Sequence, residues 1–175
     1  MTTLSEPYLM ETMNKIIFEI ETNNSLSLTA KITEVRIRDL SLKKDFIRKK
    51  DIKINEIVKY IMSADLVIVH YGLSFDLRVL INNIQDKKLQ KEFILFIMNK
   101  NKIWDIATVE KNLYSQLTKR NGETEMKFKL RIMRERTNKA KFSMENIQDK
   151  YNLKGKSTLD TIEEVYNQQY KKENL

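Results

Sequence analysis

Residues 64 to 80 read Ala64-Asp-Leu-Val-Ile-Val-His-Tyr-Gly-Leu-Ser-Phe-Asp-Leu-Arg-Val-Leu80. The first seven residues form a β-branched run that is typical of a buried central strand in a parallel sheet. Gly72 interrupts the run. From Phe75 to about Lys100 the apolar residues favour a helix in two pieces, divided near residues 86–88. The stretch therefore predicts a strand, a tight turn and a helix in succession.

Strands and helices alternate on both sides of this stretch. Before it, we predict a buried strand over Lys15–Thr22, one or two strands within Ala30–Leu42, and a helix over Ile54–Ser63. After it, we predict a short strand over Lys102–Asp105 and helices over Ile106–Leu117, Ser143–Tyr151 and Leu159–Lys172, with a buried helical segment at Phe93–Met98. This order predicts an α/β fold, in which a central mixed sheet is flanked by helices.

Composition limits the class of protein. A length of 175 residues with 41% hydrophobic content suits one domain, which we place at 13–175 behind a loose N-terminal leader at 1–12. The chain has no cysteine, so disulfides, cysteine-ligated zinc and thiol chemistry are excluded. No segment is typical of a secretory signal or a membrane span, so we expect a soluble, intracellular protein with no membrane partner.

The net charge of +8 favours polyanionic partners such as DNA or RNA, although an AT-rich genome also enriches a protein in lysine. Residues 118–141 hold nine basic residues against three acidic ones, with apolar residues interleaved. This basic insert is predicted to form a hairpin or an arm over the site, or else a solvated loop or helix face. Its candidate nucleic-acid contacts are Lys127, Lys129, Arg131 and Arg134.

Glu19 and Glu21 are two positions apart on the first predicted strand, so their side chains leave the same face. Two adjacent carboxylates repel each other unless a cation lies between them. A solvent-facing strand edge is the alternative explanation, but the apolar neighbours Ile16–Phe18 and Ile20 favour a buried strand.

Three segments resemble the motifs of DEDD 3′–5′ exonucleases, a family of the ribonuclease-H-like superfamily. Phe18-Glu-Ile-Glu-Thr22 is similar to the first motif, which usually begins with aspartate where this chain has Glu19. Residues 64–80 resemble the second motif, a strand that leads through a His-Tyr-Gly turn to Phe-Asp at a helix start. Trp104-Asp-Ile-Ala-Thr108 is similar to the strand-to-helix step that follows, and the whole resemblance spans roughly residues 14–166.

The resemblance implies a ribonuclease-H-like fold and a two-metal site for phosphodiester hydrolysis. In the family, four acids hold two Mg²⁺ or Mn²⁺ ions, which suit hard oxygen ligands. Carried over by position, the catalytic and metal-binding residues are Glu19, Glu21 and Asp76. The resemblance also implies nucleic-acid contacts by Thr22, His70, Tyr71 and Phe75.

The third motif fits the family less well. Asp160 is the best candidate for the fourth acid, but Gly155 and Lys156 occupy the positions where the family has its partner His or Tyr. Other alignments place Tyr170 or Thr161 at the position where the family has its fourth acid. Asp160 could instead cap the last helix, since a carboxylate at a helix N-terminus is favourable.

Two functions follow from these observations. The first is a metal-dependent 3′–5′ exonuclease acting on DNA or RNA, within a larger replication, repair or RNA-processing complex. The alternative is a catalytically impaired, exonuclease-like protein with a nucleic-acid-binding or regulatory function. A ribonuclease-H-like endonuclease is a third hypothesis, which the Phe-Asp helix start disfavours.

Overall fold

The computed structural model describes residues 13–114, 119–137 and 139–173. The predicted leader at 1–12 lies outside the described residues. The chain divides into two compact units, Met1–Asp105 (unit 1) and Ile106–Leu175 (unit 2).

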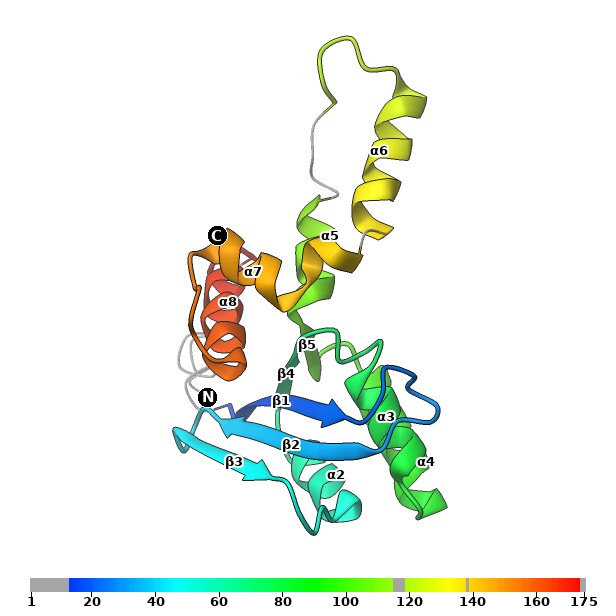
Figure 1. Ribbon diagram of the computed structural model, residues 1–175, viewed down its shortest axis with the longest axis vertical. Coiled ribbons are helices and arrows are strands. Elements are labelled where there is room, and N and C mark those ends of the chain that lie inside the picture. Colours follow the sequence, from blue (N-terminus) through cyan, green and yellow to red (C-terminus); the bar gives the residue numbers. More distant parts are fainter. Residues whose placement is uncertain (1–12, 115–118, 138, 174–175) are drawn as a thin grey trace, which may run out of the picture. The chain divides into compact units, whose positions relative to one another are not determined.

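Unit 1 is built on a mixed sheet of five strands. These are β1 (Lys15–Thr22), β2 (Ile32–Asp39), β3 (Lys44–Arg48), β4 (Leu66–Val69) and β5 (Ile103–Asp105). Their order is β3-β2-β1-β4-β5 (Figure 1). β1 to β3 pair antiparallel, whereas β4 and β5 run parallel to β1. The predicted α/β class with a central mixed sheet is confirmed. The predicted range Ala30–Leu42 contains one strand, β2, and β3 begins after that range.

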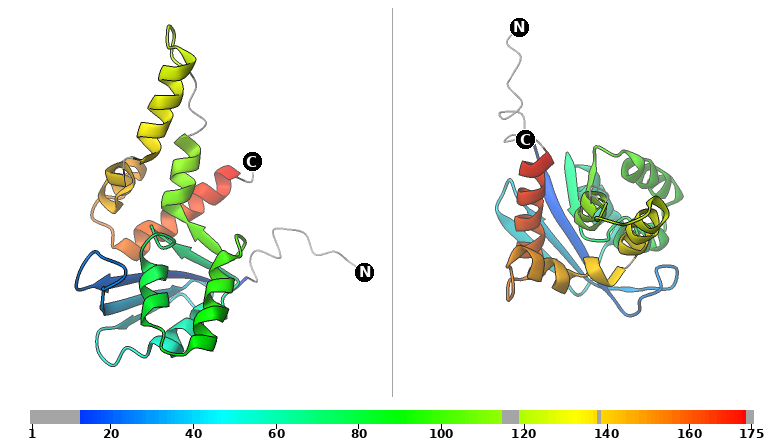
Figure 2. Two further views of the ribbon diagram at one scale, coloured as in Figure 1. Left: turned by 90° about the vertical axis from the view of Figure 1, so that its right-hand side faces the viewer. Right: turned by 90° about the horizontal axis from the view of Figure 1, so that it is seen from above.

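Three helices of unit 1 cover one face of this sheet. They are α2 (Ile54–Met62), α3 (Asp76–Asn83) and α4 (Lys87–Met98), and α3 and α4 lie side by side (Figure 2). Asp86 separates these two helices, because its carboxylate accepts hydrogen bonds from the backbone N–H groups of Lys88 and Leu89 and so caps α4. The predicted helix in two pieces is therefore confirmed.

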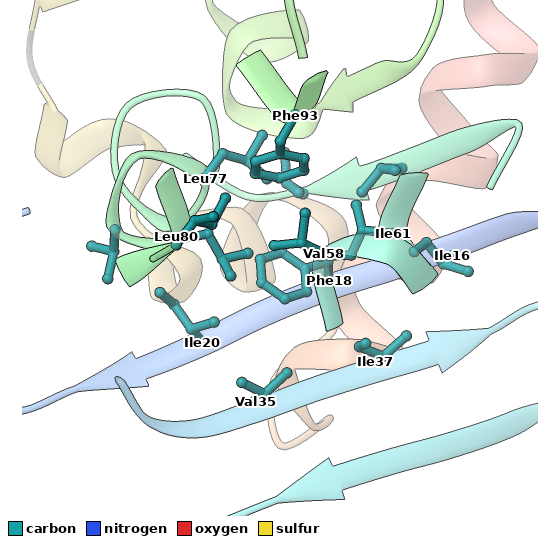
Figure 3. Close-up of a cluster of buried hydrophobic side chains, with 14 of the residues drawn as sticks. Ile16, Phe18, Ile20, Val35, Ile37, Val58, Ile61, Leu77, Leu80 and Phe93 are labelled. Carbon is teal, nitrogen blue, oxygen red and sulfur yellow. The ribbon is translucent and has the colours of Figure 1, made fainter. Parts of the chain in front are cut away.

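A hydrophobic core fills the space between the sheet and these helices (Figure 3). Phe18 of β1 and Phe93 of α4 are completely buried in it. Burying one such side chain stabilises the fold by about 1.5–3 kcal/mol. The predicted buried helix at Phe93–Met98 is wrong in part, because Leu95 and Met98 are 69% and 70% exposed. A helix turns one side to solvent, and these two residues lie on that side.

Unit 2 is helical within the residues that the structure describes. Its elements are α5 (Ile106–Tyr114), α6 (Glu125–Thr137), a 3-10 helix η1 (Lys139–Phe142), α7 (Met144–Tyr151) and α8 (Thr158–Glu173). The predicted hairpin in the basic insert is wrong: the insert contains the helix α6, as in the alternative of a solvated helix face. The predicted cap of α7 is confirmed, since Ser143 Oγ accepts the backbone N–H of Asn146.

A buried carboxylate holds α5, α7 and α8 together in unit 2. Glu110 is 1% exposed and accepts hydrogen bonds from Lys150 Nζ, the Tyr151 hydroxyl and Gln169 Nε2. Burial raises the pKa of Glu110, but these donors outweigh it and leave the pKa below its usual value. Because the charge is paired and fully hydrogen-bonded, this network is structural. None of the helices in the described part of the chain has the length and apolar character to cross a membrane.

Candidate functional site

The two predicted acids of β1 lie on the face of the strand opposite the core. Ile16, Phe18 and Ile20 point into the core, so alternation turns Glu19 and Glu21 to the other face. The predicted shared face of these two glutamates is thus confirmed. In the antiparallel pairing with β2, Glu19 lies opposite Arg36 and Glu21 lies opposite Glu34.

Arg36 joins three carboxylates on this face. Its Nη1 lies 3.3 Å from Glu19 Oε2, its Nη2 lies 2.5 Å from Glu21 Oε1, and its Nε lies 2.7 Å from Glu34 Oε1. Lys49 Nζ adds a contact of 3.2 Å to the other oxygen of Glu34. We call Arg36, Glu19, Glu21 and Glu34 the Arg36 cluster.

The Arg36 cluster changes the titration of its members. Burial raises the pKa of Glu19, and the guanidinium of Arg36 partly opposes that rise. The hydrogen bond from Arg36, helped by Lys49, holds the pKa of Glu34 below its usual value. The pKa of Arg36 itself is raised, chiefly by its hydrogen bond to Glu34. Arg36 therefore provides a positive charge that Glu19, Glu21 and Glu34 share.

Asp76 is the first residue of α3 and is buried, with 8% exposure. β1 pairs with β4 along Lys15–Ile17, and farther along β1 the backbone N–H of Ile20 donates a hydrogen bond to Asp76. Burial, together with the negative charges of Glu19 and Asp105, raises the pKa of Asp76 to about 8. The structure therefore brings Glu19 and Asp76, two of the predicted residues, into one electrostatic neighbourhood.

Asp105 is a buried acid whose role the sequence did not reveal. It ends β5, and its two carboxylate oxygens accept the backbone N–H groups of Tyr71 and Leu73 at 3.1 and 3.2 Å. Tyr71 has a φ of 55°, which a non-glycine residue adopts only when its surroundings hold it there. The signal in the sequence was the aspartate at the end of a strand, but its partners lie more than 30 residues away.

Position 72 in the same turn requires glycine, because there is no space for a side chain there. A Cβ on Gly72 would lie 2.4–2.8 Å from three side-chain atoms of Val69, which is itself in the core. The His70 and Tyr71 rings meet edge to face, with centroids 4.9 Å apart. Asp105 and Gly72 together fix the shape of the turn that precedes Asp76.

The residues predicted to contact nucleic acid in unit 1 have varied surroundings. His70 and Tyr71 are partly exposed in the turn after β4, whereas Phe75 precedes α3 and packs against the core. Thr22 ends β1 and donates its hydroxyl to the carbonyl of Asn24. These four assignments stay predictions.

Asp160 lies in the first turn of α8, in unit 2. Its carboxylate accepts the Ser157 hydroxyl at 2.7 Å, and its backbone N–H donates to Ser157 Oγ at 3.2 Å. Ser157 therefore caps α8, because its Oγ accepts the backbone N–H of Asp160, the third residue of the helix. The suggestion that Asp160 caps the last helix is wrong, because Ser157 is the cap and Asp160 lies in the first turn. The part of Asp160 in a metal site stays a prediction.

In the basic insert, Lys127 and Lys129 are exposed on α6. Arg131 instead forms a bidentate salt bridge with Glu123. The hydrogen bonds from Arg131 lower the pKa of Glu123 to about 2. Arg134 belongs to α6, but its side chain lies outside the described residues.

The fit of the described residues to a two-metal site is poor. Among residues 13–114, 119–137 and 139–173, no three His, Asp or Glu side chains are grouped so that they could hold a metal ion. Mg²⁺ needs carboxylate oxygens converging on one point at about 2.0–2.1 Å. In the Arg36 cluster, the oxygens of Glu19 and Glu21 converge on a guanidinium instead.

No protein-family model matches this sequence, and none of the curated proteins matches it. The resemblance to DEDD exonucleases therefore rests on the motifs in the chain itself.

Proposed function

We propose that this protein binds nucleic acid, on an α/β scaffold that resembles the DEDD exonucleases. The observation that carries the proposal is the surface of α6, where exposed lysines stand beside exposed apolar side chains. Lys127 and Lys129 are exposed, and Met126, Leu130 and Met133 are 73%, 50% and 59% exposed.

The spacing on α6 supports a continuous binding surface. Met126, Leu130 and Met133 are four and three residues apart, so they form one stripe along the helix. Lysines contact phosphates, and proteins that bind single strands combine such charges with exposed side chains, chiefly aromatic ones, against which the bases pack. The basic insert carries six of the chain's eight net positive charges, because it holds nine basic and three acidic residues.

The arrangement of unit 1 supports the exonuclease-like scaffold. The five-stranded mixed sheet, in the order β3-β2-β1-β4-β5, belongs to the α/β class that the ribonuclease-H-like resemblance implies. Asp76 begins a helix directly after the turn that follows β4, as the second motif of the family implies. In such sheets, ligands bind at the carboxyl ends of the strands.

Binding is tested by the anisotropy of labelled single-stranded DNA and RNA in EDTA, over a series of NaCl concentrations. Lys127→Gln/Lys129→Gln should weaken binding of all sequences alike and lower the slope of log K against log[salt] by about 0.7 per lost phosphate contact. The matched control is Lys87→Gln/Lys88→Gln, which removes two exposed lysines from α4. Equal effects of the two double variants would show that only net charge matters and would refute binding at α6.

Hydrolysis of the nucleic acid, as a 3′–5′ exonuclease, is the second candidate. The observation that favours it is Asp76, a buried acid with a raised pKa beside Glu19, because such perturbed groups gather at functional sites. The test incubates 5′-labelled single strands of DNA and RNA with the protein in Mg²⁺, in Mn²⁺ and in EDTA. Shortening of the strands from the 3′ end that Asp76→Asn abolishes would establish the exonuclease.

A further inference from the structure

We propose that the guanidinium of Arg36 is a built-in cation that takes the place of divalent metal at Glu19 and Glu21. The wild-type protein would then hold these acids together without Mg²⁺ or Mn²⁺. The inference concerns unit 1 alone and goes beyond the nucleic-acid binding proposed for α6, so the two can fail separately.

The geometry of the cluster supports the proposal first. A guanidinium offers five N–H donors in a planar fork, and Arg36 directs its Nε, Nη1 and Nη2 at three different carboxylates. Glu19 and Arg36 are directly opposed in the β1–β2 register, while Glu21 and Glu34 lie two positions along the strands. The sheet itself therefore places Arg36 at the point where the carboxylates meet.

Charge and burial support the proposal next. Glu34 is buried, with 6% of the residue exposed. Glu19 is mostly covered, with 21% of its side chain exposed. Carboxylates in such surroundings require a positive partner, because desolvation disfavours their charged forms. Arg36 meets all three acids and Lys49 meets Glu34 from the other side. The cluster therefore has its own cations.

The sequence resemblance assigns the same two glutamates to metal ions, and the structure assigns them to Arg36. Either a metal ion or the guanidinium would reduce the mutual repulsion of Glu19 and Glu21. An arginine cannot be deprotonated in a protein, so this cation stays in place at any physiological pH. Removing it should expose the need for another cation.

The test compares melting temperatures in EDTA, in MnCl₂ and in NaCl of equal ionic strength. The wild type should melt at the same temperature in MnCl₂ and in the matched NaCl. Arg36→Gln should melt several degrees lower in EDTA and recover in MnCl₂, by on the order of 5–10 °C at 100 times Kd. The matched control is Arg38→Gln, on the same face of β2 and paired with Asp45, which should not respond to MnCl₂.

Direct titration of the wild type with Mn²⁺, followed by calorimetry, decides the matter even if Arg36→Gln does not fold. Its heats should equal those of the Glu19→Gln/Glu21→Gln variant. Mn²⁺ binding by the wild type that this double variant loses would overturn the proposal. An Arg36→Gln protein as stable as the wild type in EDTA would also overturn it, since the cluster would then need no cation.

Discussion

Asp76→Asn should change the way in which stability depends on pH. The pKa of Asp76 is about 8 in the folded protein and 3.8 in its ordinary state. Because the folded value is the higher one, the protonated carboxyl stabilises the fold relative to the ionised form: this advantage is complete below about pH 4 and is lost as the pH rises to about 8. Four pKa units correspond to an upper limit of about 5–6 kcal/mol, which is comparable to the whole stability of many domains.

The asparagine variant keeps the local geometry, since its amide oxygen can still accept the backbone N–H of Ile20. It should therefore be more stable than the wild type at pH 8, with a smaller loss of stability between pH 5 and pH 8. Urea unfolding, followed by the fluorescence of Trp104 in β5, measures this directly. Trp104 is the single tryptophan, so the signal comes from unit 1.

The control for this prediction is Asp51→Asn, which changes an exposed aspartate of the same unit. Its profile should follow that of the wild type. Parallel profiles of the wild type and Asp76→Asn from pH 5 to pH 8 would refute the reasoning, because they would mean that Asp76 ionises as freely in the folded protein as in the unfolded one.

Two further predictions concern unit 2. Ser157→Ala should destabilise α8 by about 1 kcal/mol, because it removes the hydroxyl that caps the helix. Asp160→Asn should destabilise α8 less, because the amide oxygen of asparagine still accepts the Ser157 hydroxyl. Circular dichroism during urea unfolding measures both losses, and a larger loss in Asp160→Asn would contradict this prediction. Tyr151→Phe removes a hydrogen bond to the buried carboxylate of Glu110 and should cost about 1.5–3 kcal/mol at neutral pH. Since the donors lower the pKa of Glu110, the loss in Tyr151→Phe should shrink as the pH falls and the carboxyl is protonated, and a loss that is constant with pH would contradict the role of the charge.

The local pattern of the sequence was sufficient for most elements of unit 1. Alternating apolar residues in Lys15–Thr22 and the β-branched run before Gly72 predicted β1 and β4, because burial on one or both faces of a strand dictates those patterns. The shared face of Glu19 and Glu21 followed from the period of a strand alone. The basic insert was harder to predict, because its mixed charges and apolar residues fit both a hairpin and a helix, and the structure contains the helix α6.

The electrostatics of the candidate site depended on the tertiary structure. Arg36 lies 17 residues from Glu19 in the chain, and only the β1–β2 register brings the guanidinium to the carboxylates. Asp105 reaches Tyr71 and Leu73 only because β5 pairs with β4. Periodicity reports which side of an element is buried, whereas the energy of a charge depends on its distance to other charges and to water. The sequence alone therefore indicated which acids share a face, and the packing of the strands decided that an arginine lies between them.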